Sequence, residues 1–314
     1  MGNMQGWAGP LNVDWHQQQF KLQTAILTRM REFGMVPVLP GFAGHVPRAF
    51  KSHYPNSSFV DSPDWCGFPS QYGSDTLLEP TDPLFLEVGS QFHTLMLQDY
   101  GDPTGLEHPI FNADMYNEME PSTGDLDFLK ACNENTYKAM VMANPNATYM
   151  MQAWLFHEGF WTNERVEAYL SGVPIGKLLI LDLNSESSPV WNQFNDFYGH
   201  YWIWNSLVNY GGNRGLYGNL NTIATSPYAD LALANNMVGI GFTPEAMEVV
   251  PHQFDIAMEA GWRTTAPNPS EWLQSWAVRR YGLFSPSLSN AYSILETAAY
   301  NSPIDRANLE LTPS

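Results

Sequence analysis

Carboxylates gather in the stretch IFNADMYNEMEP, residues 110–121, which contains Asp114, Glu118 and Glu120. The stretch begins as an apolar strand and ends shortly after the last carboxylate, in a proline. An Asn-Glu pair directly after a barrel strand is frequent in retaining glycosidases, where the glutamate acts as general acid and base. Asn117 and Glu118 form such a pair. We interpret Asp114 as a structural hydrogen-bonding group within the strand, and Glu120 as facing solvent.

A retaining glycosidase needs a second carboxylate, and Glu245 in GFTPE supplies one at the end of the last predicted strand. Closure of a barrel would bring this strand end near that of Glu118. About 5 to 5.5 Å between the two carboxyl groups defines a retaining pair, whereas an inverting pair needs about 6.5 to 9.5 Å. The residues alone leave the inverting alternative open. They also leave open that each glutamate is a solvated or ion-paired surface group.

An alternation of strands and helices positions these residues. Apolar runs predict strands at 35–42, 110–116, 147–154, 177–183, 200–207 and 237–242. Helical patterns occupy 14–33, a segment opened by Asp82 and Pro83 as N-cap and first-turn proline, 125–142, 163–171 and a stretch near 227–234. A long loop is predicted at about 43–81. Because the strands are continuous apolar runs, we expect a parallel sheet covered on both faces.

The strand ends favour one α/β architecture over another. Residues that could do chemistry follow the strands at Asp114 to Glu118, Trp154 to His157, Asp182 to Glu186, Trp204 with Asn205, and Glu245. A (β/α)8 TIM barrel assembles its active site at the carboxyl ends of its strands, from residues of several loops. A doubly wound sheet usually has a glycine-rich first turn, and NYGGNRGLYGN lacks the GxGxxG spacing. We therefore predict a (β/α)8 TIM-barrel catalytic domain.

The predicted domain boundaries follow from the strand count. Six strands are two short of a closed barrel, so we expect residues 1–266 to be a catalytic barrel domain that is incomplete at its N-terminus, with the missing strands upstream. The strand pattern is lost from about residue 267 onward. Residues 267–314 are therefore predicted to begin an all-α, C-terminal helical domain.

Charge excludes two classes of partner. The 14 Lys and Arg residues stand against 32 Asp and Glu residues, for a formal net charge of −18. Without a basic stripe to displace counterions, nucleic acid is not an expected partner, and an anionic membrane surface is disfavoured for the same reason. No apolar run of about twenty residues could span a bilayer. The first residues do not form a signal peptide, and the acidic balance suits an acidic compartment.

The residues predict no metal and no organic cofactor. Cys66 and Cys132 lack CxxC spacing. His157 and Glu158 lack the second histidine of an HExxH motif. His45 is predicted to brace its own loop.

Several long motifs together resemble one known family. They are MGNMQGWAGPL, FGMVPVLPGFAGHVP, ADMYNEMEP, QAWLF, LLILDL, NYGGNRGLYG and MVGIGFTPE, and they run in order through about residue 300. The sequence resembles the lysosomal α-N-acetylglucosaminidase family, glycoside hydrolase family 89. This resemblance implies an exo-acting, retaining hydrolase of terminal α-linked N-acetylglucosamine, as at the non-reducing end of heparan sulfate. It also implies a lysosomal or secreted location.

The resemblance also implies roles for individual residues. Glu118 corresponds to the acid/base and Glu245 to the nucleophile. The family's sugar pocket maps onto Trp65, Asn117, Trp154, Leu183 and Tyr210. Stereochemistry supports a protein nucleophile independently. In an α-linked gluco sugar the 2-acetamido group is cis to the leaving group, so it cannot attack the opposite face of the anomeric carbon.

An alternative function from a different class is a catalytically inactive sugar-binding fragment. The family's pocket also draws on residues of the first strand, upstream, and on residues of the C-terminal helical domain. Neither group of pocket residues is expected in this sequence. The sequence leaves open the natural aglycone, homo-oligomer formation, activity of this chain alone, glycosylation of the sequons at Asn56 and Asn146, and the redox state of Cys66 and Cys132.

Overall fold

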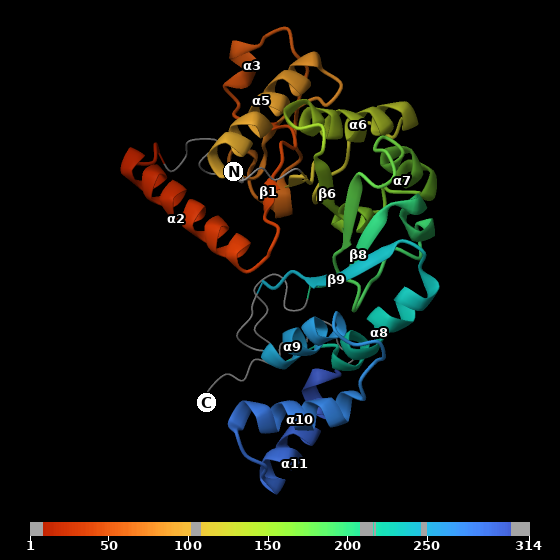
Figure 1. The fold of residues 1–314 in the computed structure, drawn as a ribbon. Helices are drawn as coiled ribbons and strands as arrows, with labels where there is room; N and C mark the ends of the chain where they lie inside the picture. Colours follow the sequence, from red (N-terminus) through yellow and green to blue (C-terminus); the bar gives the residue numbers. More distant parts are fainter. Residues whose placement is uncertain (1–8, 102–107, 208–215, 217, 246–249, 303–314) are drawn as a thin grey trace. The chain divides into compact units, whose positions relative to one another are not determined.

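The computed structural model describes residues 9–101, 108–207, 216, 218–245 and 250–302, with only the main chain described at residue 66. The chain divides into two compact units, Met1–Leu179 and Ile180–Ser314. Figure 1 shows the elements of both units as a ribbon.

The first unit contains a parallel sheet and a smaller antiparallel one. Its strands are β1 (Val38–Pro40), β2 (His45–Val46), β3 (Phe59–Asp61), β4 (Thr76–Leu78), β5 (Ile110–Asn112) and β6 (Thr148–Gln152). Strand β5 pairs in parallel with β1 on one side and with β6 on the other. Strand β4 pairs in antiparallel fashion with both β2 and β3. The parallel strands carry the candidate site at their carboxyl ends.

Helices accompany the parallel strands of the first unit. They are α2 (Val13–Glu32), α3 (Phe50–His53), α4 (Ser70–Gly73), α5 (Pro83–Tyr100), α6 (Leu126–Ala143) and α7 (Asn163–Leu170), with 3-10 turns η1 (Trp65–Gly67) and η2 (Ala153–His157). Asp82 begins α5 by accepting the N–H of Leu84 at 2.9 Å, and Pro83 occupies the first turn. This start is the one predicted from the sequence.

Helices α5 and α6 lie side by side (Figure 1). A Cβ atom on Gly89 would come within 2.8 Å of the Cβ of Ala139, so the two helices approach closely only because residue 89 is glycine. Phe85, Leu129 and Met140 are fully buried in this part of the core. The packed helices hold the strands whose ends form the site.

The second unit combines parallel strands with a helical C-terminal part. Its elements are η3 (Asn195–Gly199), β8 (Tyr201–Ser206), α8 (Leu220–Leu233), β9 (Met237–Phe242), α9 (Pro251–Ala260), α10 (Pro269–Tyr281), α11 (Pro286–Leu295) and the π-helical turn η5 (Glu296–Tyr300). Strands β8 and β9 pair in parallel. Strand β7 (Leu178–Asp182) begins in the first unit and ends in the second.

Most of the predicted elements are confirmed. Each of the six predicted strands is present, as β1, β5, β6, β7, β8 and β9, although five of them are shorter than predicted. The predicted loop at 43–81 is wrong, because this segment contains the antiparallel sheet β2–β4–β3 and two short helices. Its strands have only two or three residues, too few to produce a periodic pattern.

The expectation of strands buried on both faces is only partly met. In β6 and β7 buried residues alternate with partly exposed ones. Tyr149 and Met151 are buried in β6, whereas Met150 between them is partly exposed. In β6 and β7, one face of the strand is therefore more buried than the other, although both faces carry apolar residues.

Candidate active site

Glu118 lies on a turn that follows β5. The turn is anchored by Met115 and Tyr116, which are 2% and 4% exposed. Asn117 and Glu118 after them are exposed. Glu118 has a φ of 54°, a left-handed conformation that is uncommon for a residue with a side chain. Such backbone strain is concentrated at functional sites, and here it turns a carboxylate outward from a buried base.

Asp114 explains how the chain leaves the sheet at this point. Strand β5 pairs with β6 through Asn112 and Met150, so Asp114 lies opposite Gln152 in the same register. The carboxylate of Asp114 accepts the main-chain N–H of Gln152 at 2.7 Å. The N–H of Gln152 is thus satisfied by a side-chain oxygen and not by a main-chain carbonyl of a longer β5 strand. The backbone after Asp114 can therefore leave the sheet and form the turn. A further bond at 2.9 Å comes from the side-chain amide of Asn112, and the structural role predicted for Asp114 is confirmed.

Burial affects the proton of Asp114. Burial raises the pKa of this carboxyl above its ordinary value, against the opposing effect of the hydrogen bonds from Gln152 and Asn112. Tyr149 adds a further link between the strands by donating its hydroxyl to the carbonyl of Ala113 at 3.0 Å. The β5 and β6 ends are therefore fixed against each other by side chains as well as by main-chain pairing.

Two tryptophans hold the Glu118 carboxylate. The indole Nε1–H of Trp65, on η1, donates to Oε2 of Glu118. The indole Nε1–H of Trp154, on η2 directly after β6, donates to Oε1 at 3.3 Å. Each carboxylate oxygen thus has a neutral donor. Within the described ranges, no lysine, arginine or histidine forms an ion pair with Glu118.

Three predicted site residues therefore come together in the first unit, and a fourth lies next to them. Trp65, Trp154 and Glu118 are joined by hydrogen bonds although Trp65 is 53 positions from Glu118 in the chain. Asn117 precedes Glu118 on the same turn. The predicted assignments of these residues to a sugar pocket and to acid/base chemistry remain predictions.

The other predicted site residues belong to the second unit. Leu183 follows β7 and is buried, and its carbonyl accepts the side-chain amide of Asn205 at 3.3 Å. Glu245 is exposed and follows the end of β9 at Phe242. Tyr210 lies outside the described residues. The separation of the Glu118 and Glu245 carboxyl groups stays a prediction.

Two buried carboxylates, Asp182 at the end of β7 and Glu186 after it, were noted in the sequence only as strand-end residues. Both oxygens of Asp182 accept the main-chain N–H of Val190, and Oδ2 also accepts that of Trp191, all at 3.2 Å. Burial raises the pKa of Asp182 to about 7, although these N–H donors act to lower it. Glu186 accepts the N–H of Leu207 at 2.9 Å, at the end of β8. Strand-end position marked these residues, but nothing in the sequence indicated that they are buried.

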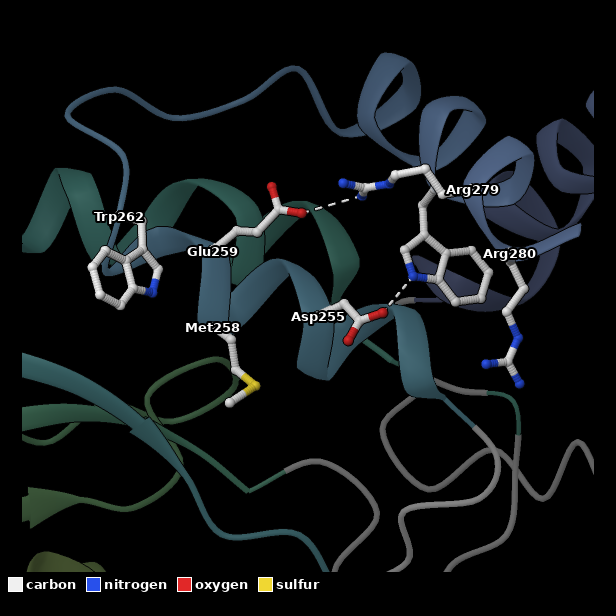
Figure 2. Close-up of a pocket in the computed structure, with 7 residues that line it drawn as sticks. Asp255, Met258, Glu259, Trp262, Arg279 and Arg280 are labelled. Carbon is white, nitrogen blue, oxygen red and sulfur yellow. Dashed lines mark hydrogen bonds and ion pairs between the residues drawn. The ribbon is translucent and has the colours of Figure 1, made fainter. Parts of the chain in front are cut away.

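The α9–α10 pocket of the second unit, a cavity of about 470 Å³, contains both signs of charge. It is lined by Asp255, Met258, Glu259, Trp262, Trp276, Arg279 and Arg280. Figure 2 shows Arg279 reaching Glu259. The Trp276 indole donates to Asp255 at 2.6 Å. The charged groups in the middle of this cavity are thus paired with protein groups.

In the described part of the chain, no group of three or more His, Cys, Asp and Glu side chains has an arrangement that could hold a metal ion. No described helix has both the length and the apolar character to cross a bilayer. Cys132 is a free, buried thiol at 3.3 Å from the Tyr116 hydroxyl, and burial raises its pKa to about 12. His45 contacts Asp75 at 3.2 Å, which confirms its bracing role.

Comparison with known proteins gives a consistent result. Residues 1–264 match the family model described as the alpha-N-acetylglucosaminidase (NAGLU) tim-barrel domain. Human alpha-N-acetylglucosaminidase is 38% identical over 305 residues, which are 96% of this chain and 40% of the human protein. The parallel strands and their helices thus belong to a TIM-barrel fold, as predicted.

Solved structures agree with this assignment. A family 89 glycoside hydrolase from Clostridium perfringens, in complex with PUGNAc, is 30% identical with a TM-score of 0.83, over 96% of this chain and 33% of that protein. A variant of the Clostridium perfringens enzyme in complex with its substrate GlcNAc-alpha-1,4-galactose has a TM-score of 0.82 at 30% identity, over 95% of this chain and 32% of that one. The chain therefore spans less than half the length of these relatives.

Proposed function

The chain belongs to the alpha-N-acetylglucosaminidase (NAGLU) family, and we propose that it is an exo-acting, retaining hydrolase of terminal α-linked N-acetylglucosamine. The observation that carries this proposal is the carboxylate of Glu118. It lies exposed on a left-handed turn after a parallel strand, and two indole donors orient it without a cation among the described residues. An oriented carboxyl group that can gain and lose a proton is what a general acid and base requires.

The reaction has two displacement steps. In the first, Glu118 donates its proton to the glycosidic oxygen while Glu245 attacks the anomeric carbon from the opposite face, and a glycosyl ester forms. In the second, Glu118 removes a proton from water, which hydrolyses the ester. The two inversions together retain the α configuration. Because the 2-acetamido group is cis to the leaving group, the protein must supply the nucleophile, and this role is assigned to Glu245.

The sugar pocket is proposed to comprise Trp65, Asn117, Trp154, Leu183 and Tyr210. Trp65 and Trp154 both lie beside Glu118, and the faces of indole rings suit the apolar face of a pyranose ring. Asn117 is exposed on the same turn and has an amide that can bind a hydroxyl or the acetamido group.

We propose that the substrate is a glycan with a non-reducing terminal α-N-acetylglucosamine. The related Clostridium perfringens enzyme binds GlcNAc-alpha-1,4-galactose as its substrate, and a heparan sulfate-like chain is the finer proposal from family resemblance. A lysosomal or secreted location is proposed on the same ground, and the net charge of −18 suits an acidic compartment. Residues 1–266 are proposed to be the catalytic domain, and 267–314, which include α10 and α11, the start of a helical domain.

Turnover of p-nitrophenyl α-N-acetylglucosaminide tests the proposal. Hydrolysis is expected for the unsubstituted chain, and proton NMR should detect the α anomer as the first-released sugar. Release of the β anomer would establish inversion instead. A well-folded chain that binds N-acetylglucosamine without turnover would favour the inactive sugar-binding fragment, an alternative motivated by the short span of the chain relative to its relatives.

Azide rescue separates the two glutamate roles. With Glu245→Ala, azide would replace the nucleophile and give the β-glycosyl azide. With Glu118→Ala, the glycosyl ester still forms from the activated substrate, and azide attack on it would give the α-glycosyl azide. Glu259→Ala, in the second unit, is the control and should form no azide product. The same anomer from both active-site variants would contradict the assignment.

A further inference from the structure

The segment Trp65–Gly73 carries three exposed aromatic side chains, and the first of them, Trp65, contacts Glu118. Trp65 is 44% exposed, Phe68 53% and Tyr72 45%. The rings of Trp65 and Phe68 are nearly parallel, with an interplanar angle of 7° and centroids 6.0 Å apart. The same Trp65 ring donates to Glu118. An aromatic surface therefore continues outward from the candidate acid/base.

The leaving group must lie close to Glu118, because a general acid acts at hydrogen-bonding distance from the atom that it protonates. The two sides of Glu118 differ in exposure. On one side, Trp154 is only partly exposed and belongs to a turn with buried Leu155 and Phe156. On the other side, Trp65 and Phe68 are open to solvent. The open side is the one that can receive a second sugar.

Polar groups of the same segment line a cavity that does not include the three aromatic rings. A cavity of about 620 Å³ is lined by residues of the segment and of its neighbours, namely Arg48, Lys51, Asp61, Ser62, Pro63, Asp64, Ser70, Gln71 and Ser74. Lys51 is paired with Asp61 at 2.6 Å, so this surface offers polar groups without a large net charge. The segment thus carries both exposed aromatic rings and the polar side chains of Ser70 and Gln71, two kinds of group that suit a sugar, whose rings have apolar faces and polar edges.

Close packing and hydrogen bonds fix the backbone conformation of this segment without a ligand. A Cβ atom on Gly73 would lie 3.1 Å from the Cβ of Phe68 and 3.2 Å from the main-chain nitrogen of Trp65, so helix α4 packs closely against both residues. The guanidinium of Arg48 donates to the carbonyl of Ser70 at 2.8 Å and to that of Ser74 at 3.1 Å. Preorganisation of this kind reduces the entropy cost of binding.

We infer that Trp65–Gly73 forms the subsite for the leaving-group sugar, with the Phe68 and Tyr72 rings as its platform. This inference rests on the proposed function and names the residues that recognise the part of the substrate beyond the terminal N-acetylglucosamine. The occupant is a pyranose linked to that sugar, and galactose in GlcNAc-α-1,4-galactose is the probe.

Two substrates with different leaving groups test the subsite. GlcNAc-α-1,4-galactose fills it, whereas α-N-acetylglucosaminyl fluoride has no leaving-group sugar. Phe68→Leu and Tyr72→Leu should each lower kcat/KM for the disaccharide about 3- to 10-fold, as expected for loss of an aromatic contact, and leave hydrolysis of the fluoride unchanged. Phe284→Leu, at an exposed aromatic position between α10 and α11, is the matched control. Equal losses on both substrates, or no loss on the disaccharide, would overturn the subsite.

A binding measurement keeps the subsite testable if the chain has no turnover. In a Glu245→Gln background, titration calorimetry should give tighter binding for the disaccharide than for N-acetylglucosamine, and Phe68→Leu should remove this difference. Equal binding of the two sugars in the Glu245→Gln protein would refute the subsite. Lack of fluoride hydrolysis would count against the proposed function alone.

Discussion

Glu118 in the first unit and Glu259 in the second both accept indole N–H groups, but their other neighbours differ. Glu118 has the indoles of Trp65 and Trp154. Glu259 has the indole of Trp272 at 2.8 Å together with the guanidinium groups of Arg263 and Arg279, at 2.8 and 3.1 Å. One carboxylate is held by neutral donors and the other by cations (Figure 2 shows the Glu259–Arg279 pair).

The difference matters for proton transfer. At Glu259, burial raises the carboxyl pKa, but the hydrogen bonds from Trp272, Arg263 and Arg279 outweigh it, so the pKa lies below its ordinary value. A carboxylate fixed by two guanidinium groups is unsuited to giving and receiving a proton in each turnover. Neutral indole donors orient a carboxylate without adding a fixed positive charge. Glu118, which is oriented without a cation among the described residues, is therefore the better acid/base candidate.

The largest expected difference between the two glutamates is the effect of their substitution on kcat/KM. Glu118→Gln should lower kcat/KM for GlcNAc-α-1,4-galactose by about 10²- to 10⁴-fold, because general acid and base catalysis is lost. Glu259→Gln should leave kcat/KM unchanged. Steady-state hydrolysis of the disaccharide measures both. Near-normal turnover of Glu118→Gln, or a comparable loss in Glu259→Gln, would remove the distinction.

Asp182 is a second carboxylate that, among the described residues, forms no ion pair, and it can be compared with Glu118 and Glu259. Its folded pKa of about 7 lies above its ordinary value of 3.8. A raised carboxyl pKa stabilises the folded state at pH values below the unfolded pKa, and this contribution is lost as pH rises through the folded pKa. Asp182→Asn cannot ionise, and its amide oxygen can still accept the N–H groups of Val190 and Trp191. The variant should match the parent near pH 4 and exceed its free energy of unfolding by a few kcal/mol above pH 7.

Urea denaturation of parent and Asp182→Asn at several pH values between 4 and 8 measures this difference. Asp99→Asn, in the last turn of α5, is the matched control for an Asp-to-Asn change at an exposed position. A constant offset between Asp182→Asn and the parent across the pH range would show that the folded protein does not retain this proton.

Much of the fold could be predicted from the sequence because its signals are local. Strands such as β9 (Met237–Phe242) are continuous apolar runs, and the start of α5 is marked by Asp82 and Pro83. Strand-end position also indicated Glu118 and Trp154, since parallel strands bring their carboxyl ends to one edge. These inferences require only neighbours in the chain.

What could not be predicted depends on contacts between distant residues. The Trp65 indole reaches Glu118 through a segment whose short strands escaped prediction. The run Asn195–Tyr198 has φ values of 48° to 53°, although none of these residues is glycine. Asp196 stabilises this left-handed turn by accepting N–H groups from Trp202 and Asn236. Asparagine and aspartate adopt the left-handed conformation as single residues, but no propensity indicates four such residues in a row. This turn depends on partners elsewhere in the chain.

The ion pairs of Glu259 predict a smaller effect on stability. Glu259→Gln should lower the free energy of unfolding at pH 7 by about 1 to 2 kcal/mol, because partly exposed charged hydrogen bonds are weakened. A depressed carboxyl pKa stabilises the folded state above the unfolded value of 4.5, and this contribution is lost as pH falls through the folded pKa. The difference from the parent should therefore shrink as pH falls below 4.5. Urea denaturation at pH 7 and pH 4 measures it, and a larger difference at pH 4 would contradict the argument.

The smallest expected effect concerns a single indole N–H. Trp65→Phe retains an aromatic face but removes the donor to Oε2 of Glu118. A lost hydrogen bond of about 1 kcal/mol should lower kcat/KM for GlcNAc-α-1,4-galactose about 5-fold. Trp272→Phe removes the corresponding indole donor of Glu259 and should change stability without changing kcat/KM. If Trp65→Phe left turnover intact while Trp272→Phe impaired it, the orienting role would belong to the cation-held carboxylate, and the comparison between the two glutamates would be reversed.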